Sequence, residues 1–525
     1  MVSTICLLRG IRLRTVRTTV WAVVTVMPLI TMSGCFIKPH PIDTGEVQSR
    51  AVKDYLAITA VEEPVSRPID LYEAMARAVK YNLDAKVKAI QVQLAHQQLN
   101  VAHYSLLPNI AANAGFDGRN NFAGGVGQAI LTGRQAVEPF TSSEKNVTSG
   151  NLALSWDVLD FGLSFVRALQ AADNVLVAEE EKRRLAVRLI QDVRGAYWRA
   201  VSAERVLPRV QYLDDSVSKA LESTKQIVGQ KLQAPLTPLN YQRDLLNIQR
   251  EVRRLFRELS TAKVQLASMM GLPPGTPFDL VIPPRDTAIP VVDLDSQKME
   301  EQALLLRPEL RTIDYKKRIN AKEAKAVFLE LFPNLKVSLG GYYNSNSFLL
   351  YQNWLSYAAQ ASWNLLSVFR TPAKLKAIEA NGHMLDVQSM ALSLSILTEV
   401  HVGATQFVLA KQEYQDARNY QQTQSAIVEQ TRNLWLTQRT NDLTLIRERA
   451  NDVAADVRLD TARAGLESAY ATLMASVGEE AVPVSMGEQN VAQLAESIRA
   501  YWESSGFTRS GEERRTKSHA TPVAH

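Results

Sequence analysis

Two short stretches, Leu106-Leu107-Pro108-Asn109 and Leu331-Phe332-Pro333-Asn334, decide the fold predicted for this chain. The shift along the chain that carries Leu106 onto Leu331 also carries Gly115 onto Gly340, and we call it the first shift. Proline disfavours a helical conformation at the residue before it, so each Pro-Asn pair marks the end of a helix. The two stretches therefore predict that one pattern of elements occurs twice.

Farther along, a second, slightly smaller shift relates the two patterns. This second shift aligns Ser155-Trp156 with Ser362-Trp363, Leu236-Thr237 with Leu443-Thr444, and Gly271 with Gly478. The difference between the two shifts falls between Gly115 and Ser155, where the first pattern has the longer loop. Few residues are identical, but the order and spacing of the markers indicate an internal duplication.

Each half begins with a predicted helix, over 69–106 and 299–331, followed by two segments in which apolar and polar residues alternate. Alternation with period two is typical of a half-buried strand. It fits equally well a membrane-barrel strand with its apolar face toward lipid. A length of about ten residues suits a tilted transmembrane strand. Loops 118–147 and 344–353 would join the strands of the two hairpins.

A very long helix follows each hairpin, over 163–229 and 373–436. About 65 residues at 1.5 Å per residue give roughly 100 Å, which exceeds an ordinary globular domain. Such a helix requires a coiled-coil or helical-barrel partner. Turns over 229–238 and 436–443 lead into shorter return helices that end near Gly271 and Gly478.

The segment 1–34 has the features of a secretory signal peptide. Its only charges are four arginines, and an apolar run of about eleven residues over 20–30 is too short to span a bilayer. Met32-Ser33-Gly34-Cys35 resembles a bacterial lipobox, which implies a covalent lipid on Cys35 and an extended tether over 35–66. The alternative is a plain secretory signal with an incidental cysteine. By the same resemblance, Phe36 after the cysteine favours the outer membrane.

Composition excludes several classes of protein. The chain has 525 residues, 46% of them hydrophobic and 22% charged, which excludes wholesale disorder. Its two cysteines, Cys6 and Cys35, exclude a disulfide framework. Without the four leading arginines, the chain has 55 basic and 54 acidic residues, so no excess of positive charge favours nucleic-acid binding.

The sequence also shows no sign of a catalytic or metal site. The seven histidines show no metal-ligand spacing, and no nucleophile elbow, P-loop or dinucleotide motif occurs. We expect neither an enzyme nor a cofactor beyond the lipid.

The repeated order of helix, Pro-Asn, hairpin, Ser-Trp, long helix, Leu-Thr turn and shorter helix resembles the TolC family of outer-membrane efflux proteins over residues 67–480. The resemblance implies a mainly α protein with a small β part. It also implies a homotrimer that forms a 12-stranded outer-membrane barrel, continued by a long periplasmic α-helical barrel. Each chain would contribute four strands and its long coiled-coil helices.

The implied function is a passive exit duct of a tripartite efflux or type I secretion system. An inner-membrane pump and a periplasmic membrane-fusion adaptor would be its partners. An open alternative is a lipid-anchored periplasmic coiled-coil scaffold without a pore. Four strands cannot close a barrel alone, because open edges in lipid leave backbone groups unsatisfied, so a duct requires oligomerisation.

By the resemblance, the turns after the long helices dock the adaptor. The predicted docking residues are Val228, Gly229, Leu232, Leu236, Thr237, Trp435, Leu443 and Thr444. Asp442, Glu448 and Asp452 are the acidic residues expected near the tunnel mouth.

The predicted domains are a signal peptide over 1–34, a lipidated tether over 35–66, a first repeat over 67–281, a linker over 282–298, a second repeat over 299–480, and an equatorial segment with a disordered tail over 481–525.

Overall fold

A computed structural model describes residues 41–60, 63–229, 236–273, 275–285, 289, 292–479 and 489–504, and every structural statement below concerns these residues. The predicted signal peptide and the predicted tail after Ser504 lie outside them. The chain divides into two units, one up to Glu62 and one from Glu63 onward. Each unit is described by itself.

The described part of the first unit is one helix, α2 (Thr44–Thr59). The sequence predicted an extended tether here, and that prediction was wrong for these residues. Pro41 and Pro64 are too far apart to interrupt a helix between them. The Asp43 carboxylate starts the helix by accepting a hydrogen bond from the Gly45 amide, as an N-cap does.

In the second unit, each predicted first helix is two helices. The pairs are α3 (Leu71–Tyr81) with α4 (Leu83–Tyr104), and α8 (Ser296–Leu306) with α9 (Pro308–Leu329). Asn82 breaks the first pair, because its side chain caps α4 by accepting from the amides of Asp84 and Ala85. Arg307 breaks the second, because Pro308 disfavours helix at the preceding residue and suits the first helical position.

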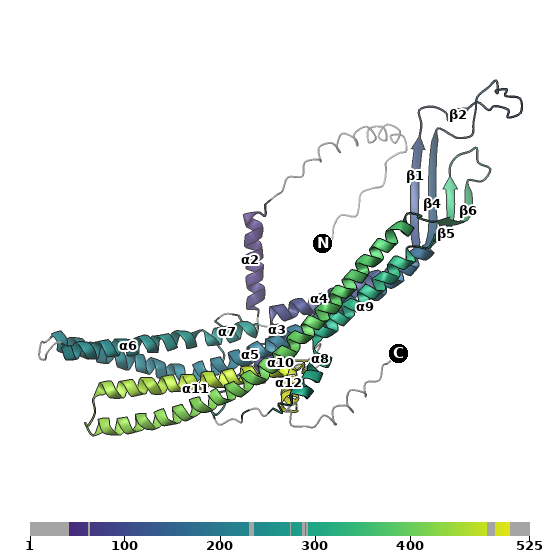
Figure 1. The fold of residues 1–525 in the computed structure, drawn as a ribbon. Coiled ribbons are helices and arrows are strands. Elements are labelled where there is room, and N and C mark those ends of the chain that lie inside the picture. The colour runs from purple at the N-terminus through teal and green to yellow at the C-terminus, as the bar shows by residue number, and fades with distance from the viewer. Residues whose placement is uncertain are drawn as a thin grey trace. The chain divides into compact units, whose positions relative to one another are not determined.

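Four antiparallel strands form the main sheet in the order β1-β4-β5-β6 (Figure 1). They are β1 (Asn109–Gly118), β4 (Asn146–Asp157), β5 (Asn334–Asn344) and β6 (Asn353–Ser362). The longer loop adds two short paired strands, β2 (Gly124–Gly125) and β3 (Phe140–Thr141). The predicted hairpins are therefore present, and β4 and β5 pair with each other between them.

The two hairpins share one register. Asn109 lies opposite Ser155 in the first, and Asn334 lies opposite Ser362 in the second. The first shift carries Asn109 onto Asn334, and the second shift carries Ser155 onto Ser362. The shifts found in the sequence therefore also relate the paired residues of the two hairpins.

Two helices of 72 and 70 residues run from the sheet, α5 (Val158–Gly229) and α10 (Ser367–Leu436). Near the sheet α5 packs against α4 and α9, and farther away against α6 (Leu236–Ser260) and α11 (Asp442–Ser476) (Figure 1). Likewise α10 packs against α9 and then against α11. The helix pairs therefore change partners midway, near the junctions α3–α4 and α8–α9.

The return helices end at the predicted glycines. The first return segment is α6 followed by α7 (Ala262–Met269), and α11 is the second. Gly271 and Gly478 follow them with φ of 71° and 80°, the left-handed conformation that glycine adopts without a Cβ penalty. The amide after each glycine donates back into the last helical turn, Leu272 to the Ala267 carbonyl and Glu479 to the Met474 carbonyl. This is the Schellman pattern of helix termination.

The predicted amphipathic segment near the C-terminus is α12 (Val491–Ser504). It buries Val491, Leu494, Ile498 and Trp502, and it packs against α3. Its apolar face joins the hydrophobic core around the middle of α5 and the end of α11. The core of the unit thus lies where the helices change partners.

Candidate functional site

The sheet has large apolar side chains in contact with no protein core. Leu152, Leu335, Leu339, Leu355 and Tyr357 are all exposed. Within the described residues, β1 and β6 each pair along one side only. The strand register places all five on one face of the sheet. A sheet with an exposed apolar face and two open edges is incomplete in water and in lipid alike, because its edge amides and carbonyls lack partners.

Aromatic rings gather at both ends of this sheet. At the loop end, Tyr342 stacks on Trp354 with centroids 5.8 Å apart. At the helix end, Trp156 meets Phe161 edge-on at 5.6 Å, and the indole of Trp363 donates to the Leu331 carbonyl at 3.0 Å. About nine residues separate the two groups along β6, roughly 30 Å, or roughly 25 Å if the strands tilt as in a barrel. Tyr342 and Trp354 lie opposite each other one position away from the pair Gly341 and Leu355, so they are on the sheet face opposite Leu355, whereas Trp156 shares the face of Leu355. Aromatic rings thus lie at both ends of the sheet, separated by about the thickness of a bilayer core.

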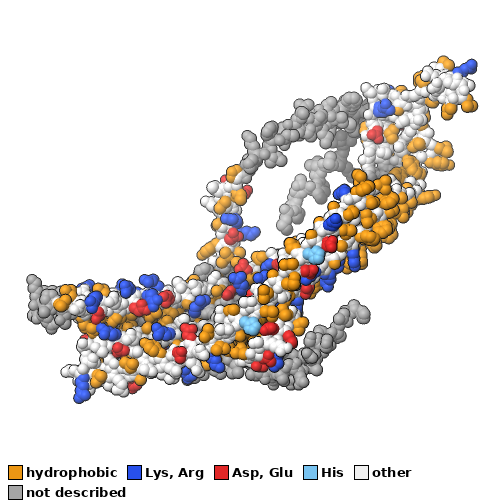
Figure 2. Space-filling view, viewed as in Figure 1, with side chains coloured by type: hydrophobic (Ala, Val, Ile, Leu, Met, Phe, Trp, Pro, Cys, Tyr) orange, Lys and Arg blue, Asp and Glu red, His pale blue; other side chains and the backbone are white. Residues whose placement is uncertain are grey.

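Exposed apolar side chains continue from the sheet onto two helices at opposite sides of the helical layer. On α4 they are Leu83, Val87, Ile90, Leu94 and Val101. On α10 they are Phe369, Met384, Val387, Met390 and Leu394. Figure 2 shows hydrophobic side chains gathered where α10 approaches the sheet. Within 83–94 and 384–394, spacings of three and four residues place these side chains along one helix face.

Helix α10 also contains an 18-residue window with a mean hydropathy of 1.3, of which 22% is buried. Among the described helices it alone meets a length-and-composition test for a membrane span. A helix of 70 residues is roughly 105 Å long, so the window is only part of it. We attribute the window to the exposed apolar stripe rather than to a separate membrane span.

The contact between α5 and α9 is ionic. Asp173 of α5, with only 2% of its surface exposed, binds Arg318 and, at 2.6 Å, Lys322 of α9. Nearer the sheet on α5, Arg167 pairs with Glu323 of α9. Burial raises the pKa of Asp173, but the hydrogen bonds from Arg318 and Lys322 outweigh it, so its pKa lies below the usual value. These carboxylates stay charged and hold the two helices together.

A second ion network joins α5, α11 and the segment between α7 and α8. Asp452, Asp456 and Asp460 recur every four residues on one face of α11 and are buried. Arg209 of α5 pairs with the first two, and Arg205 binds Asp460 at 2.7 Å. Arg285, from the predicted linker, binds Asp456 at 2.7 Å and Asp460 at 3.4 Å. The linker is thereby fastened across the two helices.

A third charged group lies in the core behind α12. Glu467 of α11 accepts from Arg194 of α5 at 2.9 Å and pairs with Arg463 at 2.7 Å. The guanidinium of Arg194 lies over the ring of Trp502, 4.6 Å from its centroid, and that of Arg463 lies over Trp198. Cation–π contact partly replaces the water that these buried cations lose.

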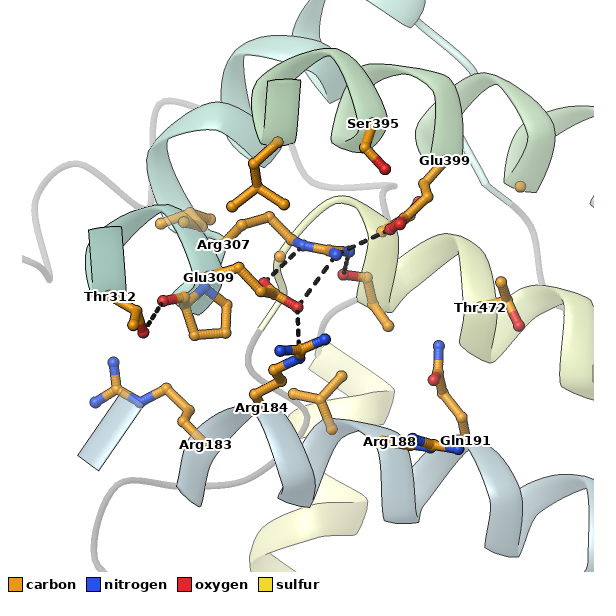
Figure 3. Close-up of a pocket in the computed structure, with 18 of the residues that line it drawn as sticks. Arg183, Arg184, Arg188, Gln191, Arg307, Glu309, Thr312, Ser395, Glu399 and Thr472 are labelled. Carbon is orange, nitrogen blue, oxygen red and sulfur yellow. Dashed lines mark hydrogen bonds and ion pairs between the residues drawn. The ribbon is translucent and has the colours of Figure 1, made fainter. Parts of the chain in front are cut away.

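A groove of about 1340 Å³ lies where α9 begins and α11 ends, between α5 and α10. Figure 3 shows Arg307 reaching both Glu309 and Glu399, while Arg184 reaches Glu309 from α5. The Arg307 guanidinium also donates to the Ala475 carbonyl at 3.2 Å. The charges therefore join all four helices at the level where they change partners.

The predicted docking residues lie at the far ends of the helices from the sheet. Val228 and Gly229 are the last residues of α5, and Leu236 and Thr237 are the first of α6. Leu232 lies outside the described residues, as does Cys35. Leu236 is 72% exposed. The first turn thus presents at least one bare apolar side chain.

The second turn is held by its own hydrogen bonds. Gln438 has a φ of 57°, and the Arg439 amide donates to the Leu434 carbonyl, which closes α10 in a Schellman pattern without glycine. The Asn441 side chain caps α11 by accepting from the amide and the hydroxyl of Thr444. Leu443 is partly buried against the core cluster. The indole of Trp435 donates to Asp442 at 2.6 Å.

The three acids expected near the tunnel mouth have different surroundings. Asp442 is bound by Trp435, and Glu448 accepts from Gln424 at 2.9 Å. Asp452 is buried with Arg209 in the second ion network. In the single chain each acid is therefore engaged with a neighbouring side chain. Sequence reasoning missed Asp456 and Asp460, although their four-residue spacing after Asp452 was a readable signal.

No protein-family model and no curated protein matches the chain. Several solved structures do match, all at low identity. The outer-membrane channel OprN is 18% identical with a TM-score of 0.58, covering 80% of this chain and 95% of its own. The MtrE outer membrane channel of Neisseria gonorrhoeae, in its open state, is 16% identical with a TM-score of 0.60, covering 78% and 88%. The CmeC outer membrane channel of Campylobacter jejuni is 12% identical with a TM-score of 0.59, covering 89% and 97%.

The chain has the TolC fold. The predicted resemblance is confirmed at the level of the fold, and the expected mainly helical architecture with a small sheet is present. In the TolC fold of this chain, the sheet and the helical layer present open edges on the same elements, β1 with α4 and β6 with α10.

Proposed function

We propose that this protein is a trimeric outer-membrane exit duct that passively conducts substrate out of the cell. Three chains would close a 12-stranded barrel, continued by a periplasmic tunnel of long helices. The internal duplication gives each chain two similar wall segments. An inner-membrane pump and a periplasmic adaptor would supply the energy and most of the specificity, as part of an efflux or type I secretion system.

One observation carries this proposal: the four-stranded sheet has two open edges, one exposed apolar face and aromatic rings at both ends. Open edges in a membrane are unstable, because unpaired backbone groups cannot bind water there. Closure with further copies removes both edges and allows the apolar face to lie in lipid. A periplasmic scaffold would leave the same face in water, at the cost of the hydrophobic effect.

We also propose that the chain is anchored in the membrane by a covalent lipid. A lipid on Cys35 would hold the N-terminus in the outer membrane near the barrel. The lipobox resemblance implies a diacylglycerol on this cysteine, and two acyl chains suffice for stable membrane attachment, so lipid and barrel would both hold the chain in the membrane.

An export assay tests the assignment of the turns. Gly229→Glu or Thr237→Arg, each placed at the end of the helices, is expected to abolish export of a pump substrate while the trimer still assembles. Gly465→Glu is the matched control, because Gly465 lies on an exposed face of α11, where an added Cβ atom would meet no neighbouring segment within 4 Å. Wild-type export by both turn variants would sink the docking assignment.

A further inference from the structure

The face of the four-stranded sheet opposite the exposed leucines is polar. The strand register places mostly serine, asparagine, alanine and glycine on it, and Val147 is its only branched aliphatic residue. The hydrophobic effect favours lipid on the leucine face and water on this one. In a closed barrel the water-facing side is the lumen. The polar face would therefore line the lumen of the proposed duct.

Two aromatic rings stand out on this polar face. The four strands contain six aromatic side chains, and the register places four of them on the leucine face: Phe116, Trp156, Tyr343 and Tyr357. Contact with lipid explains those four. It does not explain Tyr342 and Trp354, which stack on the polar face with centroids 5.8 Å apart and planes at 10°.

The two rings belong to a row that crosses the whole sheet. Asn113 of β1 lies opposite Asn151 of β4, which lies opposite Tyr342 of β5, which lies opposite Trp354 of β6. The Asn113 amide donates to the Asn151 side-chain oxygen at 2.9 Å. None of the four side chains is buried, and Trp354 is 42% exposed. We call these four residues the lumen row.

The lumen row has smaller neighbours on both sides. Side chains two positions away along a strand point the same way, so they form the next rows of the polar face. Toward the helices that row is Ala111, Ala153, Gly340 and Ser356, and toward the loops it includes Gly115 and Ser149. The lumen row therefore reaches farther from the sheet than the rows beside it, where a passing molecule would meet it.

We infer that the lumen row binds the uncharged sugar units of a saccharide cargo. This inference rests on the proposed duct and names a class of substrate for it. The C–H groups of a sugar ring pack on aromatic rings, as other apolar groups do. Sugar hydroxyls bind amides, and Asn113 and Asn151 supply both donors and acceptors. The Tyr342 hydroxyl and the Trp354 indole N–H add two further donors.

The electrostatics of the row favour a neutral ligand. None of its four residues carries a charge, and the first charged side chain met along the strands of the polar face is Asp117, four residues from Asn113. Four residues of strand span roughly 13 Å, which exceeds the screening length of physiological salt. An ion at the row would therefore gain little attraction from the sheet.

The geometry of the rings also disfavours a flat aromatic ligand between them. Tyr342 and Trp354 already stack on each other, so a planar molecule would have to separate the pair to enter. A sugar needs no such opening, because it binds beside the rings and amides. Further hydrogen-bonding side chains on the polar face lead from the row toward the helices: Ser356, Ser338, Ser155, Asn109 and Gln360. A saccharide chain would find hydrogen-bond partners along this path.

Current block by maltohexaose, a neutral oligosaccharide, tests the site in the full-length protein. In a planar bilayer, the sugar is expected to interrupt the current of single channels. Trp354→Ala is expected to shorten the interruptions at least tenfold, because it removes the larger ring of the stacked pair. Tyr357→Ala is the matched control, since Tyr357 lies on the same strand, is 86% exposed and belongs to the leucine face. It is expected to leave the interruptions unchanged.

Each result of this experiment decides a separate point. Equal interruptions in wild type and Trp354→Ala, both trimeric by mass, would overturn the site. Longer interruptions by the planar compound 9-aminoacridine than by maltohexaose would overturn the sugar assignment. A conducting trimer that maltohexaose never interrupts would overturn this inference and retain the duct, whereas a protein that forms no channel would overturn both.

Cysteine labelling tests the placement of the row independently of conductance. Asn151 and its neighbour Leu152 point to opposite faces of β4. In the protein reconstituted in liposomes, Asn151→Cys is expected to react with a charged, membrane-impermeant thiol reagent at least tenfold faster than Leu152→Cys. The wild-type protein, with Cys6 and Cys35 as its only cysteines, gives the background. Equal or reversed rates would overturn the assignment of the row to the lumen.

Discussion

Gly271 lies against the backbone of Tyr81, so that a Cβ atom at position 271 would come within 2.6 Å of the Tyr81 carbonyl oxygen. A Cβ atom at position 478 would likewise come within 2.9 Å of the Cβ atom of Leu306. Both glycines have a positive φ at the end of a return helix. The two contacts fasten the return helices to the short helices before α4 and α9.

Gly271→Ala is therefore expected to destabilise the protein by at least about 2 kcal/mol, since the left-handed conformation alone costs about 1–2 kcal/mol and the carbonyl clash adds to it. Gly465→Ala, in the open interior of α11, is expected to stabilise by about 1 kcal/mol because alanine favours helix. Denaturant unfolding in detergent measures both. Equal effects of the two substitutions would refute this account of Gly271.

Arg285→Ala tests whether the ion pairs of Arg285 with Asp456 and Asp460 hold the linker against α11. The substitution leaves Asp456, with 1% of its surface exposed, short of one partner in the second ion network. A lost hydrogen bond to a buried charge costs about 2–3 kcal/mol. We expect a loss of that size in thermal or denaturant unfolding, with increased proteolysis of the segment between α7 and α8.

Lys298→Ala is the matched control, because Lys298 pairs with Asp293 and Asp295 on the surface and its side chain is 64% exposed. No measurable change in stability is expected, since exposed pairs contribute little. Similar losses in both variants would show that the ion network has no special role.

The stability of the α5–α9 seam is expected to depend on pH. Burial raises the pKa values of Asp173 and Glu323, but hydrogen bonds from Arg318 and Lys322, and from Arg167 and Gln170, lower both below their usual values. A carboxyl whose pKa is lower in the folded state stabilises that state above its unfolded pKa. This contribution is lost as pH falls below about 4 and through the folded pKa.

Unfolding measured from pH 7 to pH 2.5 checks this dependence. In Asp173→Asn, stability at pH 7 should fall by about 2–3 kcal/mol, and the difference from wild type should shrink as the pH decreases below about 4. A constant difference across this range would contradict the assignment of the seam to ionised Asp173.

Local signals in the sequence predicted much of the fold. Proline after Leu107 and Phe332 ended two helices, and the strands, long helices and glycine-terminated return helices followed from periodicity and composition. The helix breaks at Asn82 and Arg307 depend on capping within continuous helical patterns, so periodicity did not reveal them. Helix α2 was missed for a similar reason, because a segment flanked by prolines was interpreted as extended.

The ion networks could not be predicted, because they join residues far apart in the chain. Arg194 and Glu467 are 273 residues apart, and nothing local distinguishes them from solvated charges. The acidic repeat Asp452, Asp456 and Asp460 was visible in the sequence. Its partners became apparent only when the structure brought α5 and the linker against α11. The predicted docking residues remain a prediction, since their partner is another protein.

Single-channel conductance in a planar bilayer, measured alongside the mass of the detergent-solubilised protein, tests the central claim most directly. The protein is expected to be a trimer that opens in discrete conductance steps, either as purified or after substitution at the turns next to Gly229 and Leu436. A monomer, or a trimer that conducts in neither form, would contradict the exit duct and favour a scaffold without a pore.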